Sequence, residues 1–142
     1  MAASPFVHLH LHSELSLVDG TLRIPELVER AREMGMPAVA LTDHGNLFGL
    51  VRFYQAALDA GIKPIIGSEL WLAPEGNQPA HHLVVLARDR TGYANLVRLV
   101  SRGYLEGQHK GQPRVHKEWL REHGEGLIGL SANLEGEVGY WL

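Results

Sequence analysis

Hydrophobic and polar positions alternate along the chain in two rhythms, one typical of strands and one typical of helices. Residues 6–12 alternate strictly with a period of two, which predicts a strand. From Ile24 the apolar residues recur at helical spacing, and Gly35 ends that predicted helix. The same rules predict strands over residues 37–42, 62–72, 82–87 and 127–131. They also predict three further helices: one that begins near Asn46, one over residues 93–105 and a short one over residues 117–121.

The order of these elements predicts an α/β fold. Two segments, residues 33–37 and 60–64, each combine a helix end, a glycine, an apolar residue and a proline before a buried strand. Successive strand–helix–strand units predict a parallel sheet with right-handed crossovers, and therefore an α/β layer or barrel. Within it, Asn46 is expected to cap a helix whose buried stripe comprises Leu47, Leu50, Val51, Tyr54 and Leu58.

The composition fits one globular domain without a linker. The chain has 142 residues, of which 45% are hydrophobic and 20% are charged, and its formal net charge is −3. The absence of cysteine excludes disulfides, zinc ribbons and thiol catalysis. Neither an apolar run of about eighteen residues nor a cationic leader with an apolar core occurs, so we expect a cytoplasmic protein without a membrane span. The nine histidines are the unusual feature.

Three of these histidines, His8, His10 and His12, alternate in the first predicted strand. Side chains two apart on a strand share a face and lie about 6.5–7 Å apart at Cα, so two imidazoles there can converge on one ion. Zinc and similar metals favour imidazole combined with carboxylate. The alternative is a solvated edge strand, against which Leu9 and Leu11 argue because they need a packed face opposite.

Further candidate donors follow predicted strands, at the ends where parallel α/β folds form their sites. His44 is a candidate ligand or acid–base group, or a turn histidine, and Asp43 could orient a ligand or form the turn. Glu69 lies in an apolar strand, where a carboxylate needs a cation, a hydrogen-bond partner or a path to solvent. Of His81 and His82, only one can face inward.

Together these residues predict metal-dependent phosphoester chemistry. Asp19 is the weakest single candidate, because Asp-Gly is normally only a turn. Neither a Gly-x-Ser-x-Gly elbow nor a Gly-x-x-x-x-Gly-Lys phosphate loop occurs. A multinuclear site that activates water and holds phosphate oxygens instead needs His and carboxylate donors on neighbouring strand ends. The donors expected there are His10, His12, His44, Glu69 and His82.

Several motifs, in order along the chain, also carry a family resemblance. They include Phe-Val-His-Leu-His-Leu-His-Ser at residues 6–13 and Thr-Asp-His-Gly-Asn-Leu at residues 42–47, and further matches over residues 16–20, 61–67, 91–96, 104–107 and 125–131. These segments resemble the polymerase and histidinol phosphatase (PHP) domain, and within that family the PHP domains that begin bacterial DNA polymerase III α subunits. The resemblance implies a distorted seven-stranded (β/α) barrel with up to three divalent ions, of zinc, manganese or magnesium.

The resemblance implies a ligand set, carried over residue by residue. His10 and His12 would hold the first ion, and Glu69 would bridge it to the second. His82 would help to bind the second ion. Asp19 and His44 would bind the third. His8 matches an extra histidine of the polymerase subgroup rather than a ligand. Asn133 stands where the family has a His or Cys ligand, which implies weaker binding of the second ion.

The family's closing Asp-x-His motif does not occur in residues 1–142. We therefore expect these residues to be the N-terminal portion of a PHP domain whose barrel is completed after Leu142. Two of the family's ligands would then be missing, so the 142 residues alone are expected to be inactive.

The implied parent protein is a DNA-directed DNA polymerase, a nucleotidyltransferase of DNA replication, whose PHP site acts as a metal-dependent 3′–5′ exonuclease. One alternative is a metal-depleted scaffold that stabilises the polymerase and docks a separate proofreading exonuclease subunit. Asn133 favours that alternative, whereas His12 and His44 argue against it. A stand-alone PHP phosphoesterase is the second alternative. The expected partners are DNA and the other subunits of the polymerase III holoenzyme.

Overall fold

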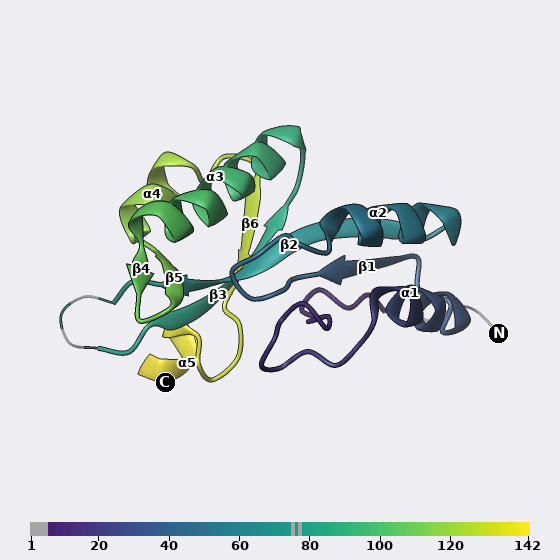
Figure 1. Cartoon of the computed structure of the whole chain (residues 1–142), viewed down its shortest axis with the longest axis horizontal. Helices are drawn as coiled ribbons and strands as arrows, with labels where there is room; N and C mark the ends of the chain where they lie inside the picture. The colour runs from purple at the N-terminus through teal and green to yellow at the C-terminus, as the bar shows by residue number, and fades with distance from the viewer. Residues whose placement is uncertain (1–5, 75, 77) are drawn as a thin grey trace.

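The computed structural model describes residues 6–74, 76 and 78–142. Figure 1 shows α1 and α2 near β1, and α3 and α4 together on one side of β2 and β3. The mixed α/β character predicted from the sequence is therefore confirmed. The elements in chain order are α1 (Ile24–Glu33), β1 (Ala38–Leu41), α2 (Leu50–Asp59), β2 (Lys63–Leu72), β3 (His81–Ala87), α3 (Arg90–Glu106), β4 (Gln108–His109), β5 (Gln112–Val115), α4 (Lys117–Glu122), β6 (Leu127–Leu130) and α5 (Glu137–Trp141).

The predicted strand over residues 6–12 is wrong, although this segment does run beside β1. Two backbone hydrogen bonds, both of 2.9 Å, join this segment to β1 and to Thr42 just after it. Ala40 N–H donates to His8 O, and Thr42 N–H donates to Leu11 O. Leu11 N–H donates instead to the side-chain oxygen of Thr42, at 2.8 Å. Because a hydroxyl takes the place of a backbone acceptor, the regular ladder of a strand does not form.

The sheet is mixed, which corrects the prediction of a parallel sheet. β1 and β5 are each parallel to β2, but β3 is antiparallel to both β2 and β6, and β4 is antiparallel to β5. A parallel connection needs a crossover of about a dozen residues or more, and residues 73–80 between β2 and β3 are too few. β2 pairs with three strands and is therefore the element on which the site can be built.

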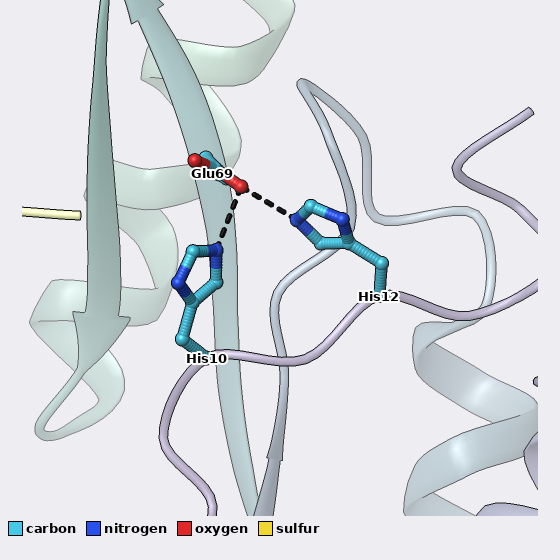
Figure 2. Close-up of side chains that lie close together, drawn as sticks. All are labelled: His10, His12 and Glu69. Carbon is cyan, nitrogen blue, oxygen red and sulfur yellow. Dashed lines mark hydrogen bonds and ion pairs between the residues drawn. The ribbon is translucent and has the colours of Figure 1, made fainter. Parts of the chain in front are cut away.

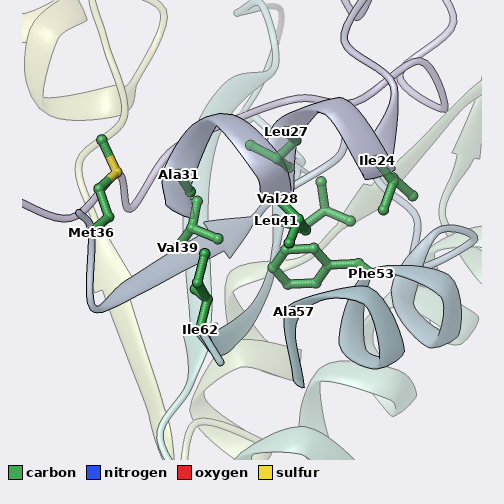
Figure 3. Close-up of a cluster of buried hydrophobic side chains, with 10 residues drawn as sticks. All are labelled: Ile24, Leu27, Val28, Ala31, Met36, Val39, Leu41, Phe53, Ala57 and Ile62. Atoms are coloured by element: carbon green, nitrogen blue, oxygen red, sulfur yellow. The ribbon is translucent and has the colours of Figure 1, made fainter. Parts of the chain in front are cut away.

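The first apolar core lies between α1, α2 and β1 (Figure 3), and it corrects the stripe predicted for α2. The helix buries Phe53 and Ala57, whereas Val51 is 81% exposed. Gly49, one turn before Phe53, permits this packing, since an added Cβ would lie 2.7 Å from the Ile24 side chain. Tyr54 and Leu58 of the predicted stripe are also exposed, at 45% and 50%.

Asn46 does not cap α2, because the helix begins at Leu50 after the N-cap Gly49. Its side chain instead forms the preceding turn, where Asn46 Oδ1 accepts a hydrogen bond from Phe48 N–H at 3.1 Å. The same amide donates to His44 O at 2.9 Å and to Leu15 O at 3.2 Å. Asn46 therefore fixes the turn that follows β1 rather than the start of the helix.

The second core packs α3 and α4 against β2, β3 and β5. Its buried members are Leu70, Val85, Leu96, Leu99, Val115 and Trp119. Asp89 caps α3, since its carboxylate accepts a hydrogen bond from Gly92 N–H at 2.9 Å. Because Leu70 of β2 belongs to this core, the core fixes the C-terminal half of β2. Among the described residues, no helix combines the length and the apolar character needed to cross a bilayer.

Candidate metal centre

Glu69 on β2 is the hub of the site, and its side chain is only 1% exposed. Its Oε2 accepts hydrogen bonds from His10 Nε2 at 2.8 Å and from His12 Nε2 at 2.5 Å (Figure 2). Its Oε1 accepts a hydrogen bond from His82 Nδ1 at 2.9 Å. One buried carboxylate thus contacts three imidazoles from two separate stretches of the chain.

His44 and Asp19 complete the cluster on one side of Glu69. His44 Nε2 lies 2.9 Å from Asp19 Oδ2 and 3.6 Å from Glu69 Oε2. His12 Nδ1 lies 3.9 Å from the same Asp19 oxygen. The structure therefore brings together all six donors predicted from the sequence. Their atoms form three overlapping groups, each compact enough for one ion: His10–His12–Glu69, His12–Asp19–His44 and His44–Glu69–His82.

Strand geometry explains how three of these donors meet. His44 forms a parallel bridge with Glu69, in the register of the β1–β2 pairing and three residues beyond its last pair. On β3, His82 is opposite Trp71, and it is therefore a diagonal neighbour of Glu69 on the same face. His10 and His12 keep the two-residue alternation of an extended chain although they are not in a strand, so both reach the same carboxylate oxygen.

Asp43 holds the loop that carries His12 and Asp19. Its buried carboxylate accepts hydrogen bonds from Ser13 N–H at 2.6 Å, from Ser13 Oγ at 2.8 Å and from Ser16 Oγ at 2.7 Å. Ser16 Oγ in turn accepts a hydrogen bond from His44 N–H at 3.1 Å. Sequence reasoning left Asp43 as either a positioning or a turn residue, and the structure shows that it anchors this loop.

Trp71 is a residue of the site that sequence reasoning missed. Its ring stacks on His44 with centroids 4.9 Å apart and an interplanar angle of 16°, and it meets His82 edge-on at 6.1 Å. An added Cβ on Gly45 would lie 2.9 Å from the Trp71 ring, so only glycine fits at position 45 beside this ring. The available sequence signal was the spacing of Trp71 two residues after Glu69, on the same face of the strand.

Burial and hydrogen bonding shift the pKa values of several groups in the cluster. Burial alone would raise the pKa of Glu69, but hydrogen bonds from His12, His82 and His10 hold it far below its ordinary value. The hydrogen bond to Glu69 raises the pKa of His12 and of His82. Burial lowers the pKa of His44, which favours its neutral imidazole. A metal ion that bound these imidazoles would displace their protons, because a metal binds the deprotonated ring.

The donor set fits divalent metal ions. Imidazole nitrogens and carboxylate oxygens are the donors that zinc and manganese accept, and Glu69 presents both of its oxygens to the cluster. In the described part of the chain, His44 Nδ1 is buried without a hydrogen-bond partner. The other ring nitrogen, Nε2, faces the Asp19 and Glu69 carboxylates and is the nitrogen through which His44 would bind a cation.

Comparison with known proteins decides the family. The sequence model of the PHP domain matches residues 8–142. The chain belongs to the PHP domain family. It is also 50% identical over 138 residues to DNA polymerase III subunit alpha of Pseudomonas aeruginosa, and 46% identical over 151 residues to that of Treponema pallidum. These matches cover 96% and 100% of this PHP chain, but only 12% and 13% of the relatives, so the chain spans about an eighth of their length.

Solved structures support the PHP fold. An amidohydrolase from Chromobacterium violaceum, described with bound sulfate and no metal, is similar with a TM-score of 0.54 and 30% identity, covering 70% of this chain and 34% of that one. A candidate metal-dependent phosphoesterase from Bifidobacterium adolescentis gives the same TM-score at 22% identity, covering 70% of this chain and 33% of that one. Both similarities agree with a partial PHP barrel.

Three residues of interest in this PHP chain lie outside the donor cluster. His8 packs its ring against Phe6, with centroids 4.8 Å apart. His81 faces the other way from His82 and packs against the Tyr140 ring at 4.7 Å, which settles which of the two histidines faces the cluster. Asn133 uses its side chain in a turn, where Oδ1 accepts a hydrogen bond from Glu135 N–H at 2.8 Å.

Proposed function

We propose that this chain is the N-terminal PHP portion of a replicative DNA polymerase III α subunit, and that its metal centre is a 3′–5′ exonuclease. The similarity to α subunits at 46–50% identity over nearly the whole chain supports the parent protein. The gathering of four histidines, Glu69 and Asp19 into one cluster supports the hydrolytic site, and it is the observation that carries the proposal. DNA and the other subunits of the replicative holoenzyme are the partners that this function requires.

Each side chain has a defined task in such a site. Divalent ions of zinc, manganese or magnesium would supply an activated water and neutralise the charge that develops on a phosphodiester. Glu69, with one oxygen toward His10 and His12 and the other toward His82, holds two parts of the cluster at a fixed separation. Asp19, at 45%, is the most exposed of the six donors, so a 3′ end would approach the cluster from its side.

The proposal is tested on the full-length protein. We expect it to shorten a 5′-labelled single-stranded DNA from its 3′ end in the presence of Mn²⁺ or Zn²⁺, and to lose this activity with chelator. His12→Ala removes a donor shared by two of the three groups and should abolish the activity. His109→Ala, on the exposed strand β4, is the matched control and should retain it. The polymerase activity of each variant reports that the protein remains folded.

A metal-depleted scaffold that docks a separate proofreading exonuclease is the second candidate. The observation that favours it is the side chain of Asn133, which is occupied in a turn and offers no donor to the cluster. Purified full-length protein that binds no metal, or a nuclease activity that His12→Ala leaves intact, would replace the exonuclease proposal with this one. Co-purification with an exonuclease subunit would then be the positive test.

A further inference from the structure

We propose that Glu135 is an additional ligand of the metal centre, beside His82, and that Asn133 holds it there. The inference rests on metal binding as set out in the proposed function, and it adds a residue that sequence reasoning did not consider. Its basis is a contact between two elements that are far apart in the sequence, the start of β3 and the loop between β6 and α5.

The first observation is the double contact of one imidazole nitrogen. His82 Nδ1 lies 2.9 Å from Glu69 Oε1 and 3.5 Å from Glu135 Oε2. A single Nδ1–H donates well to one of these oxygens and leaves the other carboxylate without a good partner. A divalent cation bound at this nitrogen would draw in the exposed Glu135 side chain, so that both carboxylates share the ion.

The second observation is the number of donors. The group His44–Glu69–His82 offers three ligand atoms within reach of one ion, whereas zinc in proteins takes four ligands. Glu69 also serves the group with His10 and His12, so it is shared between ions. Glu135 would supply the fourth donor from the protein. Its side chain is 69% exposed, so it can turn toward an ion without disturbing packed structure.

The third observation is that the loop is built to present this side chain. Asn133 Oδ1 accepts a hydrogen bond from Glu135 N–H at 2.8 Å, and Asn133 O accepts one from Gly136 N–H at 3.0 Å. Glu135 O accepts a hydrogen bond from His82 N–H at 3.0 Å, and His82 forms a bridge with Gly136. An added Cβ on Gly136 would lie 1.9 Å from Ser131 O, so the turn requires glycine. The loop is therefore tied to His82 by its backbone.

The neighbouring acid shows the contrast. Glu137, two residues later, forms an ion pair with Lys117 at 2.5 Å and so has a cationic partner from the protein. Glu135 has an imidazole of the donor cluster as its neighbour instead. Asn133 therefore acts as a positioning residue: it contributes no ligand atom, but its turn directs the carboxylate that does.

The test is a Zn²⁺ titration of the full-length protein, stripped of metal, by equilibrium dialysis and elemental analysis. Glu135→Gln keeps the size of the side chain and removes its charge. We expect it to weaken binding of one ion by on the order of tenfold or more and to leave the others unchanged. Glu118→Gln, an exposed acid in the first turn of α4, is the control and should match the wild type.

Two further outcomes separate the possible errors. Unchanged Zn²⁺ affinity in Glu135→Gln, while the wild type binds zinc, would overturn this inference alone. A wild-type protein that binds no Zn²⁺ would overturn the proposed function as well. Asn133→Ala should weaken the same ion by a smaller factor, and it should add nothing in the Glu135→Gln background. An additive loss would make Asn133 a ligand itself and would overturn its positioning role.

Discussion

The two sides of the metal centre are held in different ways. On the N-terminal side, the loop that carries His12 and Asp19 is fastened to the end of β1 by three hydrogen bonds to the buried carboxylate of Asp43. On the C-terminal side, the loop with Asn133 and Glu135 is exposed and is shaped by one side-chain hydrogen bond and a few backbone bonds. We refer to these as the anchored side and the open side.

The difference teaches where rigidity and adaptability lie in this site. A buried acceptor with three donors gives the anchored side one geometry, because each alternative leaves an unsatisfied polar group in the core. The open side can change its donor without disturbing the core, because Glu135 is exposed. Substitution of a ligand on the open side should therefore alter the affinity for one ion, whereas damage on the anchored side should alter the fold itself.

The largest effect is expected at the hub that joins the two sides. Glu69→Gln keeps the shape of the side chain but removes the charge that both sides share. We expect Zn²⁺ affinity to fall by more than about 100-fold, beyond the loss typical of an outer-shell residue. Elemental analysis after dialysis measures this, with Glu118→Gln as the control. Full zinc content in Glu69→Gln would show that the two sides bind metal independently.

The next largest effect tests the anchor. Asp43→Ala leaves the hydroxyls of Ser13 and Ser16 and one backbone N–H without their acceptor. We expect a loss of about 3 kcal/mol or more in the free energy of unfolding, since hydrogen bonds to a charged group contribute about 1.5–3 kcal/mol each. Urea denaturation measures it, and Asp59→Ala at the exposed end of α2 is the control. A loss as small as that of the control would mean that the loop is held by other contacts.

The anchored side was largely predictable from the sequence. His10, His12 and His44 were found because a two-residue alternation and the ends of strands are local features that a single sequence displays. Glu69 and His82 were found because a charged or histidine residue in an apolar strand needs a partner. Asp43 was ambiguous, because its role depends on Ser13 and Ser16, which reach it only after the loop has folded back.

The open side and the sheet direction were less predictable, for one physical reason. Which loop returns beside His82 depends on the antiparallel pairing of β3 with β6, and the parallel sheet predicted from the sequence did not include that pairing. Glu135 contacts His82 only through this arrangement. Trp71 meets His82 through the antiparallel pairing of β2 with β3, which the predicted parallel sheet also lacked. The stripe predicted for α2 was wrong for another reason, because the helix turns Phe53 and Ala57, rather than Val51, toward α1 and β1.

A smaller effect is expected from Trp71, which contacts a histidine of each side. Trp71→Leu removes the stacked ring from His44 and the edge contact with His82. Aromatic pairs contribute about 0.5–1.5 kcal/mol, so we expect Zn²⁺ affinity to fall by up to about tenfold. Trp141→Leu on the exposed helix α5 is the control. If the zinc isotherms of the two variants coincide, the stacking does not position His44.

The smallest effect is a pH dependence of the metal-free protein. Hydrogen bonds to Glu69 raise the pKa of His12 and His82 above the ordinary value of 6.5. Groups with a raised folded pKa stabilise the protein fully below the unfolded pKa and lose that contribution as the pH rises through the folded pKa. We therefore expect the Tm in chelator to fall as the pH rises above about 6.5, and Glu69→Gln to show a weaker fall.

Zinc should reverse that dependence. A metal binds only the deprotonated imidazoles, so the affinity for Zn²⁺ should rise over the same pH range in which the metal-free protein becomes less stable. The Tm difference between zinc-loaded and metal-free protein should therefore widen as the pH rises. A difference that stays constant would mean that His12 and His82 do not exchange their protons for the ion, and that the short contacts around Glu69 serve the fold rather than a metal.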